Sequence, residues 1–342
     1  MKNNIILFLF LLVLLVFLPA AAGVQETSIG EEGGSFPSSS ALSEASENSD
    51  AEDEVPADLG DSSSFRLLDT STGEILTVDD RDFLYGAIVT EMPLLYEKEA
   101  LKAQGIAAYT CYSRLRSLQR ANPDASLKGA DFSVNTSDWY IYATKEQMEE
   151  QWGENFDTYY ARLTEVIDEI YGKTLQSEGE LITAVYFAVS SGSTEASADI
   201  WGGERAYLQP VASPWDAYAP GYRTKVRVTE TEFKDKILAA HPDASLEEDS
   251  ENWTGEILRT DAGSVTALSV GGETLTGGEM RELFSLRSQN FTLTFDNGMA
   301  VFDVRGWGHG VGMSQVGANY LAGQGMTYEE ILAWYYPGAA IV

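Results

Sequence analysis

The chain has 342 residues, of which 53 are acidic and 22 basic, so its formal net charge at pH 7 is −31. This acidic excess excludes the basic surface that nucleic-acid binding requires, and an uncharged or weakly charged substrate fits better than a phosphate-rich one. The length allows two domains. Cys111 is the only cysteine, so no intramolecular disulfide can form.

The first 23 residues have the pattern of an export signal. Lys2 precedes fourteen consecutive apolar residues at 5–18, and an Ala-rich ending follows at 19–23. The apolar stretch through Ala22 is also just long enough to span a bilayer as an uncleaved anchor. We therefore interpret residues 1–23 as a signal peptide or an N-terminal membrane anchor, and both alternatives place the rest of the chain outside the cytoplasmic membrane.

Residues 24–64 have the composition of a linker, with eleven acidic residues, no basic residue and many serines. Such a segment buries too little apolar surface to offset the entropy of ordering, so we expect a disordered tether. Residues 65–342 form the predicted folded part. They contain 42 acidic and 21 basic residues, so their own formal net charge is near −21.

Residues 83–118 predict two packed helices with a carboxylate at the turn between them. Pro93 disfavours a helical conformation for the residue before it, so the first helix should end near Glu91. Small or apolar residues then recur at steps of three and four, at Ala100, Ala103, Ala107, Cys111, Leu115 and Leu118. We expect Cys111 to be a buried core residue and not a reactive thiol.

The middle of the chain predicts further elements around a hydroxyl-rich loop. Residues 131–142 indicate loop and a short strand, 145–171 a helix that stops at Gly172, and 181–187 a buried strand. The loop Ser190-Ser191-Gly192 follows, and then aromatic residues. Hydroxyls, backbone donors and aromatic rings suit a sugar site, although composition alone favours ordinary turns with core aromatics.

Residues 222–305 are β-rich. We expect strands at 223–228, 257–260, 264–270, 291–295 and 300–304. Thr231 is expected to cap a helix that runs to about Ala240. The sequence Asp296-Asn297-Gly298 predicts a hairpin turn. The predicted fold class is α+β.

A glycine-rich segment, GWGHGVGMSQVGANYLAGQG, occupies residues 306–325. It lacks the Gly-Lys-Ser/Thr ending of a phosphate-binding loop, which excludes that interpretation. His309 and His241 are the only histidines, and we expect His241 to lie at a helix end. Because no second histidine is near His309 in sequence, we expect it to form a local hydrogen bond and not a metal site.

Four separated motifs, from residue 84 to the C-terminus, share their order with a known family. They are Glu91-Met92-Pro93 with EALKAQ at 99–104, the Ser190 loop with WGG at 201–203 and Tyr207-Leu208, GWGHGVGMSQ at 306–315, and LAWYYPG at 332–338. Together they resemble the SpoIID/LytB family. The resemblance implies a lytic transglycosylase that cuts peptidoglycan glycan strands lacking stem peptides, forms 1,6-anhydro-muramic acid ends and works with a cell-wall amidase during engulfment in sporulation.

The resemblance also implies site residues. Glu91 is implied as the catalytic residue of a helix-rich part of a domain at 65–342, with the Gly-rich loop returning to the same cleft. The implied substrate-binding residues are Lys102, Ser190, Ser191, Gly192, Trp201, Tyr207, Trp307, His309 and Gln315. No cofactor is implied.

Physical chemistry gives Glu91 a defined role beside this resemblance. A transglycosylase closes the sugar's own C6 hydroxyl onto C1, so one carboxyl can donate the proton and then accept one. That carboxyl must start protonated, and burial beside Met92, Pro93 and the helix would raise its pKa. Without the resemblance, a surface contact near a helix end would be the simpler interpretation.

Two departures from the family pattern leave other functions open. Tyr109 stands where many members have arginine, and residues 131–142 contain none of the Cys or His that bind zinc in some members, so we expect no zinc. A glycan-binding partner or amidase enhancer without catalysis is the main alternative. A serine hydrolase using Ser190 or Ser191 with His309 is weaker, because no elbow motif or orienting carboxylate is evident.

Overall fold

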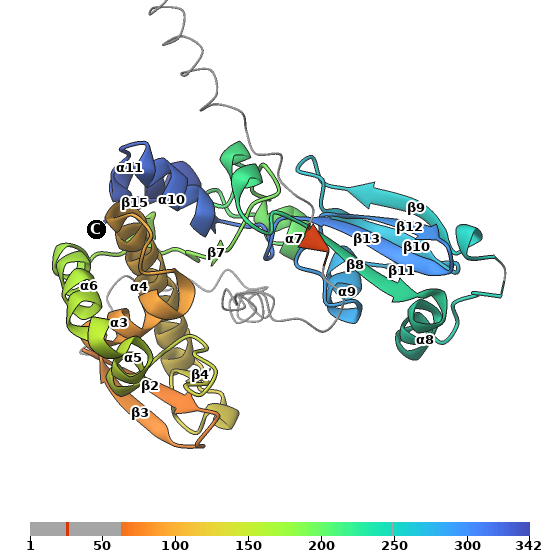
Figure 1. The fold of residues 1–342 in the computed structure, drawn as a ribbon. Coiled ribbons are helices and arrows are strands. Elements are labelled where there is room, and N and C mark those ends of the chain that lie inside the picture. The colour runs from red at the N-terminus through yellow and green to blue at the C-terminus, as the bar shows by residue number, and fades with distance from the viewer. Residues whose placement is uncertain (1–24, 27–62, 248) are drawn as a thin grey trace, which may run out of the picture.

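The computed structural model describes residues 25–26, 63–247 and 249–342 (Figure 1). It is the α+β fold that the sequence predicts, with a helical lobe and a β-rich lobe. The predictions for the export signal and for most of the linker at 24–64 lie outside the described residues. Within them, no helix combines the length and apolar character that a membrane crossing requires.

Helix α4 (Lys98–Ala121) is the axis of the helical lobe. Four helices pack against it, namely α3 (Asp80–Glu91), α6 (Phe156–Ile170), α10 (Gln315–Gly323) and α11 (Tyr328–Tyr335). Close approach is possible because Ala100, Ala103 and Ala107 on α4 are small and fully buried. The predicted helix pair is confirmed, and Cys111 is buried as expected.

The turn between α3 and α4 is stabilised by hydrogen bonds from a third helix. Met92 leaves the helix with extended backbone (φ −130°, ψ 139°), as the following Pro93 favours. Arg162 of α6 then donates hydrogen bonds to the carbonyl oxygens of Leu94 (3.0 Å) and Tyr96 (2.7 Å). Since these bonds come from a third helix, the chain reversal is fixed by tertiary structure as well as by proline.

A small sheet lies at one end of the helical lobe (Figure 1). It consists of β2 (Ser64–Asp69), β3 (Ile75–Asp79) and β4 (Phe132–Val134). Strand β2 pairs antiparallel with β3 and parallel with β4. The short strand predicted within 131–142 is confirmed, whereas the β2–β3 hairpin was not predicted.

The single helix predicted at 145–171 is wrong, because the chain forms α5 (Lys145–Trp152) and then α6. Gly153 separates the two helices with φ 51° and ψ −123°, a conformation that only glycine adopts without strain. The predicted stop at Gly172 is confirmed by its left-handed φ of 83°.

The strand predicted at 181–187 is also interrupted. Residues 182–185 form tight turns, in which the Ala184 N–H bonds to the Ile182 carbonyl (3.0 Å). The flanking pieces pair in different sheets. Strand β6 (Glu180–Leu181) pairs with β5 (Leu175–Ser177), which also pairs with β15 (Ala340–Ile341), and β7 (Tyr186–Phe187) pairs in parallel with β14 (Met313–Ser314). Strand β7 therefore links the middle of the chain to the Gly-rich segment.

The β-rich lobe has its own hydrophobic core, formed between residues 226 and 304. One sheet has the order β1 (Gln25–Glu26), β8 (Arg223–Thr229), β13 (Met299–Arg305) and β12 (Phe291–Asp296), and the other has β11 (Glu273–Leu275), β10 (Val265–Val270) and β9 (Thr254–Arg259). Helices α8 (Glu230–Ala240) and α9 (Gly277–Leu283) pack on these strands. All five predicted strands are present, with ends shifted by a few residues.

Two turn predictions in this lobe have different outcomes. Asn297 and Gly298 form the predicted hairpin turn, with φ values of 51° and 77°. The cap predicted for α8 is wrong, because the Thr229 hydroxyl accepts the Glu232 N–H (3.1 Å), and Thr231 lies inside the first turn.

Tyr109 belongs to a buried charge network that joins α3 to α4. Its hydroxyl donates to Asp80 Oδ2 (2.7 Å), and Arg116 Nη1 donates to Asp80 Oδ1 (2.7 Å). The Arg116 guanidinium also lies over the Phe65 ring, 4.1 Å from its centre. Tyr109 therefore supports the packing of α3 against α4.

Replacing Arg116 should destabilise the protein strongly. Arg116→Met leaves the Asp80 carboxylate buried without its cation, which typically costs about 3–5 kcal/mol of unfolding free energy. Denaturant unfolding followed by circular dichroism measures this loss. Arg114→Met, on a less buried face of α4, is the control and should cost under about 1 kcal/mol. Equal losses in the two variants would contradict a structural role for the Asp80–Arg116 pair.

Candidate active site

Glu91 is the last residue of α3, and only 7% of its surface is exposed. Burial raises the pKa of its carboxyl to about 8, and the hydrogen bond from Gln315 opposes only part of that rise. The position at a helix C-terminus acts in the same direction, because the negative end of the helix dipole disfavours a second negative charge. At pH 7 the carboxyl is therefore mainly protonated.

Gln315, the first residue of α10, reaches Glu91 from a distant part of the chain. Its Nε2 lies 3.3 Å from Glu91 Oε2 and 3.4 Å from Oε1 of Gln104 on α4. Helices α3, α4 and α10 thus each supply one side chain to this hydrogen-bonded group. The partner of Glu91 is a neutral amide, whereas a cation at this position would favour the ionised carboxylate and lower its pKa.

A buried polar atom near this group, Gln104 Nε2, has no hydrogen-bond partner within the described part of the chain. The buried hydroxyls of Tyr112 and Tyr186 lie beside each other in the same region. Burial holds the pKa of both phenols well above the usual range, and Glu91 adds to this rise once it ionises at high pH. Unpaired buried polar atoms are rare in folded proteins, so the unpaired Gln104 amide beside a protonated carboxyl marks a candidate ligand site.

Asp216 organises the Ser190 loop. Its Oδ1 accepts the Ser190 N–H (2.9 Å) and the Ser314 hydroxyl, and its Oδ2 accepts the Ser213 hydroxyl. Burial raises the pKa of Asp216 to about 6, while these three hydrogen bonds act in the opposite direction. Both oxygens are therefore occupied by the protein, which suits a structural carboxylate better than a second catalytic one.

The other residues of the Ser190 loop have defined neighbours. The Ser190 hydroxyl accepts the Gly192 N–H (3.1 Å), and Gly192 has a φ of 125° that favours glycine. The Ser191 carbonyl accepts the Tyr222 hydroxyl (2.9 Å), and its side chain lines a pocket at the β-rich lobe. The loop thus connects the two lobes.

His309 is a neutral, fully engaged histidine. Its Nδ1 accepts the Val311 N–H (3.1 Å), which leaves Nε2 as the donor to the Tyr186 carbonyl (3.1 Å). Burial lowers its pKa to about 3. The Trp201 ring packs on it at a centroid distance of 5.0 Å. No ring nitrogen is left to activate a serine, so the geometry argues against the serine-hydrolase alternative, and the expected local hydrogen bond is confirmed.

The other substrate-binding residues that the resemblance implies have contacts that do not involve Glu91. Lys102 forms ion pairs with Glu99 (2.6 Å) and Glu169 (2.5 Å), and the Tyr207 hydroxyl accepts the Thr183 N–H (3.1 Å). The Trp307 ring lies under Arg287, 4.0 Å from its guanidinium carbon. Of the implied binding residues, Gln315 alone has a hydrogen bond to Glu91 within the described ranges. Substrate roles for the others stay predictions, as does a cleft shared by Glu91 and the Gly-rich loop.

Gln104 and Asp216 are site residues that the sequence analysis did not select. Gln104 lies one residue after Ala103 of the apolar stripe, so its polarity inside a buried helix was the available signal. Asp216 follows Trp215 in an irregular segment and carries no periodic signal. Its importance depends on the nearby Ser213 and on two distant serines, Ser190 and Ser314, that only the fold brings to it.

Across the described residues, no group of three or more His, Cys, Asp or Glu side chains is arranged to hold a metal ion. The absence of stoichiometric zinc stays a prediction. Elemental analysis of purified protein tests it, and one chelatable zinc per chain would contradict it.

Comparison with known proteins gives a consistent assignment. A family model described as SpoIID, Stage II sporulation protein, matches residues 69–176, which include α3, α4 and Glu91. Stage II sporulation protein D of Bacillus subtilis (strain 168) is 31% identical over 273 residues, covering 80% of this chain and 77% of that protein. Its namesake from Bacillus amyloliquefaciens is 32% identical over 273 residues, with 80% and 76% covered.

A more distant relative is named an amidase enhancer, from Bacillus subtilis (strain 168). It is 25% identical over 309 residues, which cover 75% of this chain and 40% of that protein. The identity and coverage of the two sporulation proteins show that the chain belongs to the SpoIID family.

The raised pKa of Glu91 should make the stability of the protein depend on pH. Because the folded pKa of about 8 lies above the ordinary 4.5, the stabilisation from the bound proton is complete below pH 4.5 and lost as pH rises towards 8. Over this window the unfolding free energy of wild type should fall relative to that of Glu91→Gln by about 1.4 kcal/mol per pH unit.

Denaturant unfolding at pH 5, 6, 7 and 8 measures this difference. Glu150→Gln, which removes an exposed carboxyl on α5, controls for the loss of one acidic group. A difference between wild type and Glu91→Gln that stays flat across the series would show that the carboxyl is solvated and ionised.

Proposed function

We propose that this protein is a peptidoglycan lytic transglycosylase that cuts glycan strands lacking stem peptides and leaves 1,6-anhydro-muramic acid ends. The observation that carries this proposal is the buried carboxyl of Glu91, whose pKa is raised to about 8 and whose hydrogen-bond partner is neutral. Membership of a family of stage II sporulation proteins supports a role in cell-wall remodelling during sporulation. Such a substrate places the folded part outside the cytoplasmic membrane.

The reaction begins with proton donation. Protonated Glu91 gives its proton to the glycosidic oxygen as the bond from that oxygen to C1 of muramic acid breaks. The carboxylate left behind accepts the proton of the C6 hydroxyl, whose oxygen closes onto C1. The carboxyl is protonated again at the end, and no water enters the products.

One carboxyl group is enough for these reaction steps. The candidate site provides one, that of Glu91. Glycosidases that use water normally need a second carboxylate as base or nucleophile. Asp216 is a buried carboxylate in contact with Ser314, the residue before Gln315, but its two oxygens accept three hydrogen bonds from the protein. The unpaired Nε2 of Gln104 is instead available to donate a hydrogen bond to a sugar hydroxyl.

A glycan-binding partner of a cell-wall amidase is the second candidate. The relative named an amidase enhancer favours it, although this chain covers 40% of that protein. Such a partner would bind peptide-free glycan without cutting it. The two functions therefore differ in product formation and not in binding.

Changing Glu91 to glutamine should abolish most of the turnover and leave binding intact. The amide keeps the size of the side chain but cannot donate the acid proton, and general acid catalysis typically contributes about 10²–10⁴-fold. We expect a kcat loss on that scale with peptide-free glycan strands, measured by mass analysis of the released ends, and little change in glycan pull-down. Wild type should produce 1,6-anhydro ends.

Glu165→Gln, on the exposed side of α6, is the control and should keep turnover. Near wild-type turnover in Glu91→Gln would refute the role of Glu91. Reducing ends as the main wild-type product would indicate hydrolysis. Glycan binding by folded wild type with no cleavage would favour the amidase-partner function.

A further inference from the structure

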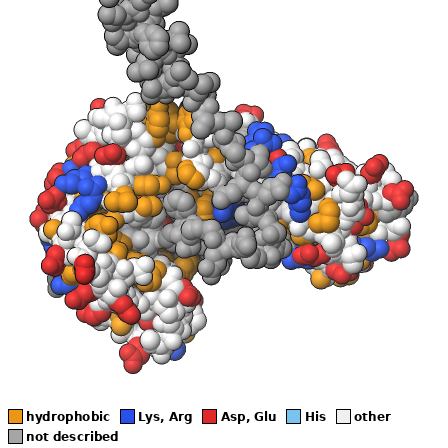
Figure 2. Space-filling view, in the orientation of Figure 1, with side chains coloured by type: hydrophobic (Ala, Val, Ile, Leu, Met, Phe, Trp, Pro, Cys, Tyr) orange, Lys and Arg blue, Asp and Glu red, His pale blue; other side chains and the backbone are white. Residues whose placement is uncertain are grey.

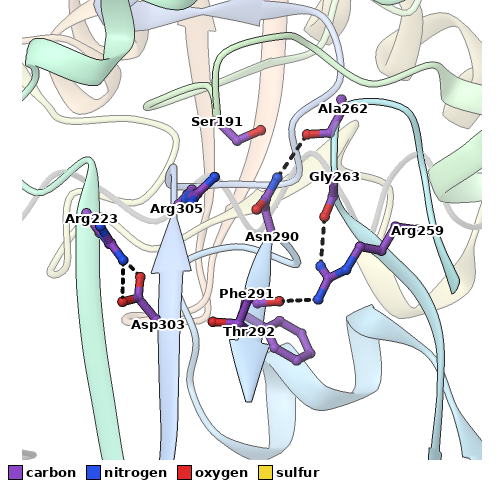
Figure 3. A pocket seen from close by; sticks show the side chains of 10 residues that line it. All are labelled: Ser191, Arg223, Arg259, Ala262, Gly263, Asn290, Phe291, Thr292, Asp303 and Arg305. Carbon is purple, nitrogen blue, oxygen red and sulfur yellow. Dashed lines mark hydrogen bonds and ion pairs between the residues drawn. The ribbon is translucent and has the colours of Figure 1, made fainter. Parts of the chain in front are cut away.

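A pocket of about 240 Å³ lies at the end of the β-rich lobe where β8 begins and β13 ends (Figure 3). Three arginines line it, namely Arg223, Arg259 and Arg305, together with Ser191, Asn290 and Asp303. Figure 3 shows Arg305 between the other two arginines. Neither the reaction proposed for Glu91 nor the family motifs use these arginines.

The arginines are only partly neutralised. Arg223 forms a two-pronged ion pair with Asp303 (2.6 and 2.7 Å). Arg259 donates to two carbonyl oxygens, those of Gly263 (2.9 Å) and Phe291 (2.8 Å). Within the described residues, neither Arg259 nor Arg305 has a carboxylate partner. Three cations therefore share one carboxylate.

This positive site belongs to a strongly acidic protein. Figure 2 shows Lys and Arg side chains gathered on the edge of the β-rich lobe nearest the helical lobe, with acidic side chains spread over the outer surfaces. Burial, and then the charge of Arg305, lowers the pKa of Arg259. A bound anion would relieve this repulsion, and the guanidinium fork matches the geometry of a carboxylate.

The pocket is connected to the candidate active site through short contacts. Ser191 lines the pocket, and its neighbour Ser190 donates its N–H to Asp216. Asp216 accepts the hydroxyl of Ser314, which directly precedes Gln315, the partner of Glu91. These contacts link the arginine pocket to the segment that positions the partner of Glu91.

We propose that this pocket binds the lactyl carboxylate that muramic acid exposes once its stem peptide has been removed. The proposal rests on the proposed function. In peptidoglycan that still carries peptides, the same lactyl group is a neutral amide, so Arg259 and Arg305 distinguish peptide-free strands from intact ones. Asn290 and Ser191 supply neutral hydrogen-bonding groups beside the charge, as a sugar requires.

Three forms of one glycan preparation test this assignment in binding experiments with the full chain. The first is peptide-free strands, the second is the same strands with their lactyl carboxylates converted to methylamides, and the third is strands that keep their peptides. Wild type should bind the first form at least about tenfold more tightly than the second, because charged hydrogen bonds are lost. The preference should shrink at high salt.

Arg305→Gln is the test variant, because its side chain makes no hydrogen bond or ion pair within the described residues and its loss should leave thermal melting unchanged. It should remove most of the preference for peptide-free over amidated strands. Arg66→Gln removes an equal charge from an exposed position on β2 and should keep that preference. Arg259→Gln should act like Arg305→Gln if it folds.

Measuring binding and cleavage separately distinguishes failure of this proposal from failure of the proposed function. Equal affinity of wild type for peptide-free and amidated strands would overturn the carboxylate assignment even if both are cut to 1,6-anhydro ends. If Arg305→Gln weakens the binding of peptide-bearing strands as much as that of peptide-free strands, the pocket binds stem-peptide carboxylates. That result would overturn the muramic acid assignment. A retained carboxylate preference without any cleavage would support the pocket and contradict the transglycosylase.

Discussion

The structure around the candidate active site depends on keeping charge away from the end of α3. An ionised carboxylate is costly there because water is largely excluded and the helix dipole is unfavourable. Gln315 satisfies the Glu91 carboxyl without supplying a cation, and it does so across 224 positions of sequence. The packing of α10 against α4 therefore positions the neutral partner of Glu91 as well as forming part of the core.

Asp216, unlike Glu91, is a buried carboxylate that several hydrogen-bond donors of the protein stabilise. Hydroxyls from Ser213 and Ser314 and the N–H of Ser190 converge on it, which ties the hydroxyl-rich loop to the segment that positions Gln315. In the function proposed here, the helical lobe supplies the acid and the β-rich lobe supplies recognition of the strand. The Asp216 contacts lie between these two parts, so they set the spacing of acid and arginine pocket.

Local rules were sufficient for features that one residue or a short pattern decides. Pro93 ended α3 as expected, and the Asn297-Gly298 turn formed because both residues tolerate positive φ. Periodicity failed where backbone conformation overrode it, as at Gly153, which divides a continuous apolar pattern into two helices. Gln104 and Asp216 could not be identified as site residues, because their roles arise from partners far away in sequence. In the arginine pocket, sheet pairing places Arg305 beside Arg223, whereas Arg259 comes from β9 in the other sheet.

The central claim is that Glu91 carries a proton at neutral pH. Infrared difference spectra between wild type and Glu91→Gln, recorded across a pH titration, isolate the carbonyl stretch of this one protonated carboxyl. The account predicts that the band persists at pH 7 and disappears with a midpoint near pH 8. A band that is already lost near pH 4.5, the ordinary range of a glutamate, would show that Glu91 is ionised at neutral pH and cannot be the proposed acid.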